Sequence, residues 1–156
     1  KTDLAVIRPS NGYWYILRSS DSGLTATWWA TSEDVPVVGD YDGDGKSDIA
    51  VYRPSNGYWY VIRSSDSVVT STWWGVSGDI PEPGDYDADG KTDIAVYRPS
   101  NGYWYVRNSS TGSISSDWLP SAVAAMARIC VVSESVPKRA NAARSSSVAL
   151  RCAASA

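Results

Sequence analysis

Two short acidic loops carry the residues whose types and spacing could do chemistry. One runs from Asp40 to Asp48 as Asp-Tyr-Asp-Gly-Asp-Gly-Lys-Ser-Asp, and a second repeats the pattern from Asp85 to Asp93. Carboxylates at loop positions 1, 3, 5 and 9, a glycine at position 6 and a backbone carbonyl at position 7 match the first part of an EF-hand calcium loop. The sequence therefore predicts two Ca²⁺ sites. The predicted ligands are Asp40, Asp42, Asp44, the Lys46 carbonyl and Asp48 in the first site, and Asp85, Asp87, Asp89, the Lys91 carbonyl and Asp93 in the second.

The loops depart from an EF-hand at position 12, where Val51 and Val96 replace the bidentate glutamate. With fewer bidentate ligands we expect weak affinity, on the order of 10⁻⁴ M, and a structural role for the ion. A tenfold excess of calcium would then add roughly 1.4 kcal/mol of stability per site. The alternative is a polar Asp/Gly turn without an ion, but the ligand spacing occurs twice in register.

Catalytic chemistry is not expected. The sequence has no histidine, which removes the commonest general base and the partner of a serine or cysteine nucleophile. The only glutamates, Glu33, Glu82 and Glu134, lie in no recognisable site motif. We therefore predict a protein that is not an enzyme, with no catalytic residue and no organic cofactor.

The aromatic residues are 8 Trp and 10 Tyr with no Phe, so every aromatic ring carries a hydrogen-bonding group. A run of Asn-Gly-Tyr-Trp-Tyr recurs three times and supplies candidate residues for stacking on sugars. The alternative, which we favour, is that these rings pack between repeats. The candidate glycan contacts are Tyr13, Trp14, Tyr58, Trp59, Tyr103 and Trp104.

The elements that position these residues repeat with a period of 45 residues. This offset aligns Asp3 with Asp48 and Asp93, and it aligns three copies of Arg-Pro-Ser-Asn-Gly-Tyr-Trp-Tyr. Repeats of this length usually form one supersecondary unit each and stack on their neighbours. We therefore predict a repeat region over 1–118, with repeats at about 1–39, 40–84 and 85–118, and a separate segment over 119–156.

Within a repeat the hydrophobic pattern has a period of two. In 48–53, Ile49 and Val51 share one face and Ala50 and Tyr52 share the other, which is typical of a strand. Asn-Gly at 56–57 predicts a hairpin into 58–63. Further strands are expected over 68–74 and, marked by proline, over 81–86. The sequence predicts an all-β fold of tandem four-stranded antiparallel blades, as in a β-propeller.

The run Gly-Asp-Tyr-Asp-Gly-Asp-Gly-Lys-Ser-Asp-Ile-Ala-Val-Tyr-Arg-Pro at 39–54 resembles the FG-GAP or VCBS-type repeats of secreted and surface proteins, which are related to the blades of integrin α-subunits. The resemblance covers 1–118. It implies calcium-stabilised propeller blades, an extracellular setting, and adhesion or glycan binding. Such propellers normally close with more blades than this chain offers, so we expect completion by oligomerisation or by further blades of a longer chain, or else blades that stack in an open way.

The segment 119–156 differs in composition from the repeats. It carries a net charge of +4, against −7 for 1–118, and has no glycine, aspartate or aromatic residue. We predict an irregular or partly helical tail, with 122–132 permissive for a helix. Its two cysteines, Cys130 and Cys152, would be able to pair in an oxidising compartment.

These features suggest an extracellular or cell-surface repeat protein that acts in adhesion or forms structural filaments. The alternative is a calcium-dependent, lectin-like carbohydrate-binding propeller. Expected partners are further copies of the chain or further blades, glycans and cell-surface proteins. Nucleic acid is not expected, because the repeat region is acidic, and no apolar run is long enough for a membrane span.

Overall fold

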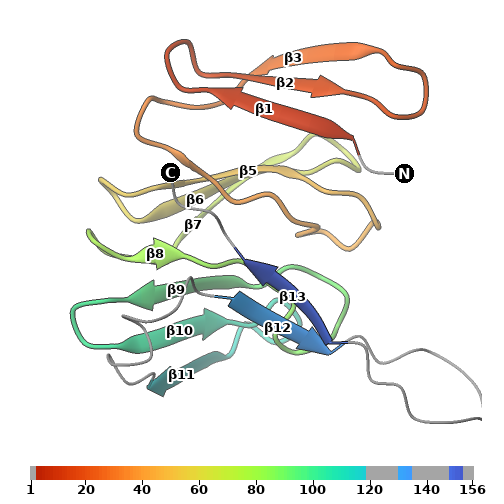
Figure 1. Cartoon of the computed structure of the whole chain (residues 1–156). Helices are drawn as coiled ribbons and strands as arrows, with labels where there is room; N and C mark the ends of the chain where they lie inside the picture. The colour runs from red at the N-terminus through yellow and green to blue at the C-terminus, as the bar shows by residue number, and fades with distance from the viewer. Residues whose placement is uncertain (1–2, 119–129, 135–147, 153–156) are drawn as a thin grey trace, which may run out of the picture.

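The computed structural model describes residues 3–118, 130–134 and 148–152, and every regular element within them is a β-strand. Three antiparallel sheets of three or four strands lie stacked one above another along the repeat region (Figure 1). The predicted all-β, blade-like fold is confirmed. The described strands form a stack of sheets and do not close into a ring.

Each four-stranded sheet has a simple order in which chain neighbours pair, β4-β5-β6-β7 in the middle sheet and β8-β9-β10-β11 in the third. The first sheet has the order β1-β2-β3. The strands are β1 (Leu4–Arg8), β2 (Tyr13–Leu17), β3 (Leu24–Trp28), β4 (Val35–Pro36), β5 (Ile49–Arg53), β6 (Tyr58–Ile62), β7 (Val69–Trp73), β8 (Ile80–Pro81), β9 (Ile94–Arg98), β10 (Tyr103–Arg107) and β11 (Ile114–Trp118).

The proline-marked strand is the first strand of a sheet and not the last strand of the preceding one. The sequence predicted it over 81–86 as the fourth strand of the preceding unit, but it is the two-residue β8, which pairs with β9 of the following sheet. The bridge between Gly84 and Asp93 continues this pairing toward the acidic loop. Proline removes a backbone donor, so a short edge strand is where the sheet tolerates it best.

The predicted hairpin between β5 and β6 is present, with a loop over Pro54–Gly57. Gly57 has a φ of 72°, and its N–H donates to the carbonyl of Arg53. The Asn56 side chain accepts from the N–H of Tyr58 and donates to the Tyr60 hydroxyl. Only the glycine of the Asn-Gly pair therefore uses left-handed geometry, while the asparagine caps the turn with its side chain.

The middle sheet is buried on both faces, which confirms the period of two. Val51 is 1% exposed and packs with Trp14 and Ala30 of the first repeat. On the opposite face, Tyr52 belongs to a core cluster that includes Val96 of the third sheet. Burial of each large apolar side chain contributes about 1.5–3 kcal/mol, so the two interfaces between sheets supply the core.

The described part of the tail is a two-stranded antiparallel pair, β12 (Cys130–Glu134) and β13 (Val148–Cys152). The expected irregular or helical tail is therefore wrong over these residues, where β-branched valines favour a strand. Residues 119–129, 135–147 and 153–156 lie outside the described part. In the backbone register Cys130 lies opposite Cys152, and their pairing stays a prediction. No helix capable of crossing a bilayer occurs in the described residues.

Candidate metal centres

Both acidic loops connect a short proline-containing strand to the long strand that follows it. The first loop lies between β4 and β5 and is closed at its base by a bridge between Gly39 and Asp48. There the N–H of Asp48 donates to the carbonyl of Gly39 over 2.7 Å. The second loop, between β8 and β9, is closed in the same way by Gly84 and Asp93. The repeat thus presents the same loop at the same place in two successive sheets.

The carboxylate of Asp40 organises the first loop from its centre. Its oxygens accept backbone N–H groups from Gly43, Asp44 and Gly45 over 2.6–3.2 Å. Gly43 and Gly45 have φ values of 84° and 83°, which bring these N–H groups around the carboxylate. The loop is therefore wrapped around one acidic side chain, as the glycine at loop position 6 predicts.

The last aspartate of each loop is buried. Asp48 is 1% exposed, and its two carboxylate oxygens accept the N–H groups of Tyr41 and Ser64 over 2.9 and 2.7 Å. Asp93 is 0% exposed and accepts from Tyr86 and Ser109 in the same arrangement. A carboxylate held by two backbone donors anchors the loop to the strand beside it, so this position has a structural role with or without an ion.

Two serines that follow β6 complete the first loop. The Ser64 hydroxyl donates to Asp44 over 2.9 Å, and the Ser65 hydroxyl donates to Asp42 over 2.6 Å. Ser109 and Ser110 make the same contacts to Asp89 and Asp87 in the second loop. The Ser-Ser pair was not among the candidate site residues identified from the sequence. Its recurrence 45 residues later was the signal that could have identified it.

Ser65 also lowers the pKa of one carboxyl group in the loop. Its hydroxyl hydrogen bond is the main cause that lowers the pKa of Asp42, and the N–H of Asp44 adds to this effect. The lowered pKa favours the ionised carboxylate of Asp42, which is the form that binds a metal. The ammonium group of Lys46 neutralises the negative charge of the loop only weakly, because it is largely exposed and lies 3.8 Å from the Asp44 carboxylate.

The carboxylates of each loop converge. In the first loop, ligand atoms of Asp40, Asp42 and Asp48 lie within 4.8 Å of one another, and in the second loop those of Asp85, Asp87 and Asp89 do so. Asp44 and Asp93 are not part of these groups of three, although they are hydrogen-bonded within their loops. Several carboxylate oxygens on a short loop are the hard donors that Ca²⁺ prefers, so the residues present fit this ion.

The candidate glycan contacts divide into two groups. Trp14 and Trp59 are 3% and 0% exposed, and Trp104 is half-buried. The indole N–H of Trp59 donates to the carbonyl of Trp74 over 2.8 Å. Trp14 and Trp59 pack between sheets, and proposing them as glycan contacts was wrong, because their rings are not accessible. The remaining candidates, Tyr13, Tyr58 and Tyr103, are partly exposed.

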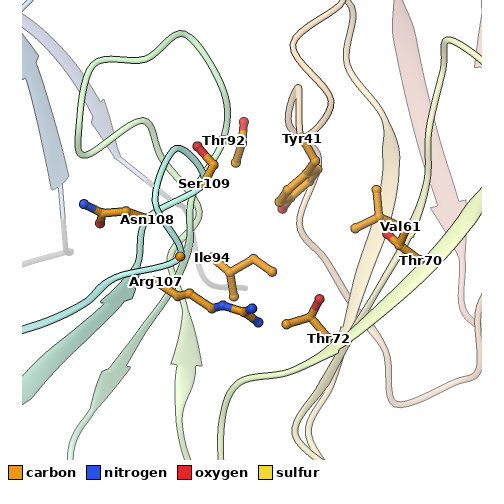
Figure 2. A pocket seen from close by; sticks show the side chains of 10 residues that line it. Tyr41, Val61, Thr70, Thr72, Thr92, Ile94, Arg107, Asn108 and Ser109 are labelled. Carbon is orange, nitrogen blue, oxygen red and sulfur yellow. The ribbon is translucent and has the colours of Figure 1, made fainter.

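A polar cleft of about 240 Å³ lies between the middle and third sheets beside the acidic loops. Tyr41 and Thr72 line it on the side of the middle sheet, and Ile94 and Arg107 line it on the other (Figure 2). Figure 2 shows the Arg107 side chain extending across the cleft toward Thr72. Arg107 is the equivalent, one repeat later, of Ile62 in the middle sheet. The cleft between the middle and third sheets is therefore more polar at this position than the contact one repeat earlier.

A comparison with protein families matches residues 40–96 to the FG-GAP-like repeat. The match begins at the first aspartate of the first loop and extends into β9 of the third sheet, so it includes both loops. Repeats of this family suggest an adhesion-type module and are typically non-catalytic. No curated protein and no solved structure matches the chain.

Proposed function

Since the chain carries FG-GAP-like repeats, we propose that it is a non-catalytic, extracellular calcium-binding repeat protein that acts in cell-surface adhesion or forms a structural, filament-like assembly. The convergence of three carboxylates in each of two equivalent loops is the observation that carries this proposal. The loops occupy equivalent positions in the middle and third sheets, so one ion would stabilise each of these two sheets.

Hydrogen bonds within the chain already order the first loop and its carboxylates. In the first loop, Asp40 holds the backbone, Asp48 anchors it to the residue after β6, and Ser65 donates to Asp42 and lowers its pKa. A bound Ca²⁺ would supply positive charge that relieves the repulsion among the carboxylates. We therefore expect the ion to tie the loop to its blade and to raise the stability of the fold, without taking part in a reaction.

Thermal unfolding in millimolar calcium and in EDTA tests this function. We expect the unmodified chain to melt several degrees higher with calcium, since each site contributes roughly 1.4 kcal/mol at tenfold excess. The double variant Asp42→Asn/Asp87→Asn should lose this difference. Asp66→Asn, which changes an exposed aspartate outside the loops, should retain it. Equal melting temperatures of the unmodified chain in calcium and EDTA would contradict the calcium assignment.

The outer face of the first sheet supports a role in assembly. Leu4 and Val6 are 70% and 63% exposed there, whereas the equivalent Val51 is 1% exposed because the first sheet covers it. The sheet face that is buried in the middle sheet is therefore exposed in the first sheet. We propose that a further blade covers Leu4 and Val6, from another copy of the chain or from the rest of a longer one.

Light scattering tests self-association through this face. The chain should form oligomers or larger particles, and Val6→Lys should shift the mass toward the monomer by placing a charge in the apolar contact. Val76→Lys is the control, since Val76 is exposed and lies outside that face. A monomer at all concentrations would argue against assembly through this face while leaving the calcium proposal intact.

Carbohydrate binding is the second candidate function. It is favoured by aromatic side chains that stay exposed in every repeat, although they are not the tryptophans that the sequence pointed to.

A further inference from the structure

Each repeat exposes a tyrosine directly opposite a tryptophan at the turn end of its hairpin. The tyrosine begins the middle strand of the hairpin and the tryptophan ends the next strand, so their side chains lie on the same face, with Cβ atoms about 4.5–5.5 Å apart. The tyrosines are 36–38% exposed and the tryptophans are 58–66% exposed. The three pairs are Tyr13–Trp28, Tyr58–Trp73 and Tyr103–Trp118.

These pairs are not part of the packing between blades. Trp28 belongs to the sheet whose outer face is uncovered, and Trp73 belongs to the sheet that the first sheet covers. Their exposures are nevertheless similar, at 66% and 58%. On the same faces, exposure falls from 63% at Val6 to 1% at Val51. Stacking a neighbouring blade buries the valine and leaves the tryptophan open, so core packing does not account for the exposed ring.

The aromatic pairs are also held in place. The missing Cβ of Gly12 lets the indole nitrogen of Trp28 rest on the turn, since an added Cβ would lie 3.0 Å from that atom. Tyr13 lies beside Tyr15, with ring centroids 6.0 Å apart, and the Arg8 guanidinium lies 5.0 Å from the centre of the Tyr15 ring. A ligand that stacks on such a pair would find the rings already ordered, which lowers the entropic cost of binding.

We propose that the three Tyr–Trp pairs are stacking platforms for an uncharged glycan chain, an inference that rests on the proposed adhesive function and names its ligand class. Indole and phenol rings offer flat apolar faces to the C–H surfaces of sugar rings, and their N–H and O–H groups can bond to hydroxyls at the ring edges. The repeat region carries a net charge of −7, which disfavours nucleic acids and other polyanions.

At the second and third platforms, the arginine directly opposite the tyrosine is already paired and offers no free cation to an acidic ligand. In the second and third repeats, the arginine at the end of the adjoining strand is engaged by a buried aspartate. Arg53 binds Asp34, and Arg98 binds Asp79, each with two hydrogen bonds of 2.8–3.0 Å. The ligand that fits best is therefore neutral as well as able to stack.

The repetition of the platform suggests an extended ligand. The starts of β2 and β10 lie on the same side of the stack (Figure 1), so the first and third pairs face one edge of the molecule. The acidic loops lie at the other ends of the long strands, because β5 runs from the loop to the hairpin turn. A polymeric glycan that touches several platforms would gain avidity of about 10²–10⁴ over one contact.

Binding to a glycan array and to insoluble cellulose and chitin tests this inference. The unmodified chain should bind at least one neutral glycan saturably, and the triple variant Trp28→Ala/Trp73→Ala/Trp118→Ala should bind it at least tenfold more weakly. The control variant Val68→Ala/Val69→Ala/Ile114→Ala removes exposed apolar side chains from the same hairpins and should bind normally. Each protein is first checked for a cooperative melt, because cross-strand aromatic pairs also stabilise hairpins by about 0.2–1 kcal/mol.

Two outcomes would overturn the inference. One is the absence of binding to any glycan by the folded chain, which would leave the pairs as hairpin stabilisers or as contacts for a protein partner. The other is unchanged binding by a folded triple variant. Neither outcome depends on calcium, because the melting difference between calcium and EDTA is measured separately and tests the proposed function.

Discussion

The backbone N–H of Thr92 donates a hydrogen bond of 2.6 Å to the carbonyl oxygen of Asp40. Thr92 belongs to the second acidic loop and Asp40 to the first, so this bond joins the two loops directly. The Lys91 side chain lies against Gly43 at the same contact. An ion that orders one loop is therefore expected to stabilise the next through a short, rigid connection.

Gly39→Ala should break this connection. A Cβ at position 39 would lie 2.5–2.9 Å from three side-chain atoms of Thr92, so the loops would have to separate. We expect a loss of roughly 1–3 kcal/mol in the free energy of unfolding, measured with urea at pH 7. Gly84→Ala is the matched control, because Gly84 holds the same position in the next repeat and meets only the movable Tyr86 ring, at 3.2 Å or more. Equal losses in the two variants would show that the loop contact is energetically unimportant.

Asp34→Asn should destabilise the middle blade. Burial pushes the pKa of Asp34 up, but hydrogen bonds from Arg53 and Thr31 outweigh it and lower the pKa below its usual value. The Asp34 side chain is 0% exposed, whereas Arg53 is 27% exposed, so removing the charge should cost roughly 3 kcal/mol, near the lower end of the range for a buried pair.

The pH dependence of this effect has a definite sign. A lowered carboxyl pKa contributes stability above its unfolded value near 3.8, and that contribution is lost as the pH falls through the folded value. The difference between the unmodified chain and Asp34→Asn should thus be full at pH 7 and shrink below about pH 4. Asp21→Asn, which alters an exposed pair with Arg18, should change little at any pH. A constant difference down to pH 2 would argue against the ion pair as the cause.

Glu82→Val should stabilise the third sheet above neutral pH. Burial raises the pKa of Glu82 to about 7, and the equivalent residue one repeat earlier is Val37, which is 2% exposed. A raised carboxyl pKa contributes stability fully below its unfolded value of 4.5, and this contribution is lost as the pH rises to about 7. We expect Glu82→Val to gain roughly 1–3 kcal/mol at pH 8 in urea unfolding.

Glu82→Gln separates the charge from the shape of the side chain. It should flatten the decline between about pH 4.5 and 7 as Glu82→Val does, since both variants remove the titrating group. Glu33→Gln, which alters an exposed glutamate, should leave the decline in place. If Glu82→Gln keeps the same slope as the unmodified chain, the buried carboxyl is not its source.

The long strands of each blade were predicted well, because alternating hydrophobicity and turn residues within a few positions of each strand define them. The alternation of Ile49 and Val51 with Ala50 and Tyr52 gave both faces of β5 correctly, and Asn56-Gly57 gave the hairpin. The pairing of β8 was not predictable in this way. A two-residue strand carries no period, so its choice between the preceding and the following sheet depends on the acidic loop that ties it to β9.

The candidate site shows a similar division. The spacing of the aspartates predicted the loops, but it did not distinguish the buried anchor Asp48 from the more open Asp42, because burial depends on Ser64 and the strand beside it. Exposure of aromatic rings was also beyond the sequence. In the first two Tyr-Trp-Tyr runs the tryptophan points between sheets, and the accessible tryptophan, such as Trp73, is the first of the later Trp-Trp pair.

Counting bound calcium by equilibrium dialysis or isothermal titration calorimetry tests the central claim most directly. We predict two ions per chain with a dissociation constant on the order of 10⁻⁴ M, and none for Asp42→Asn/Asp87→Asn. Asp66→Asn should still bind two. A folded chain that binds no calcium at millimolar concentration, or a double variant that binds as much as the unmodified chain, would contradict the account.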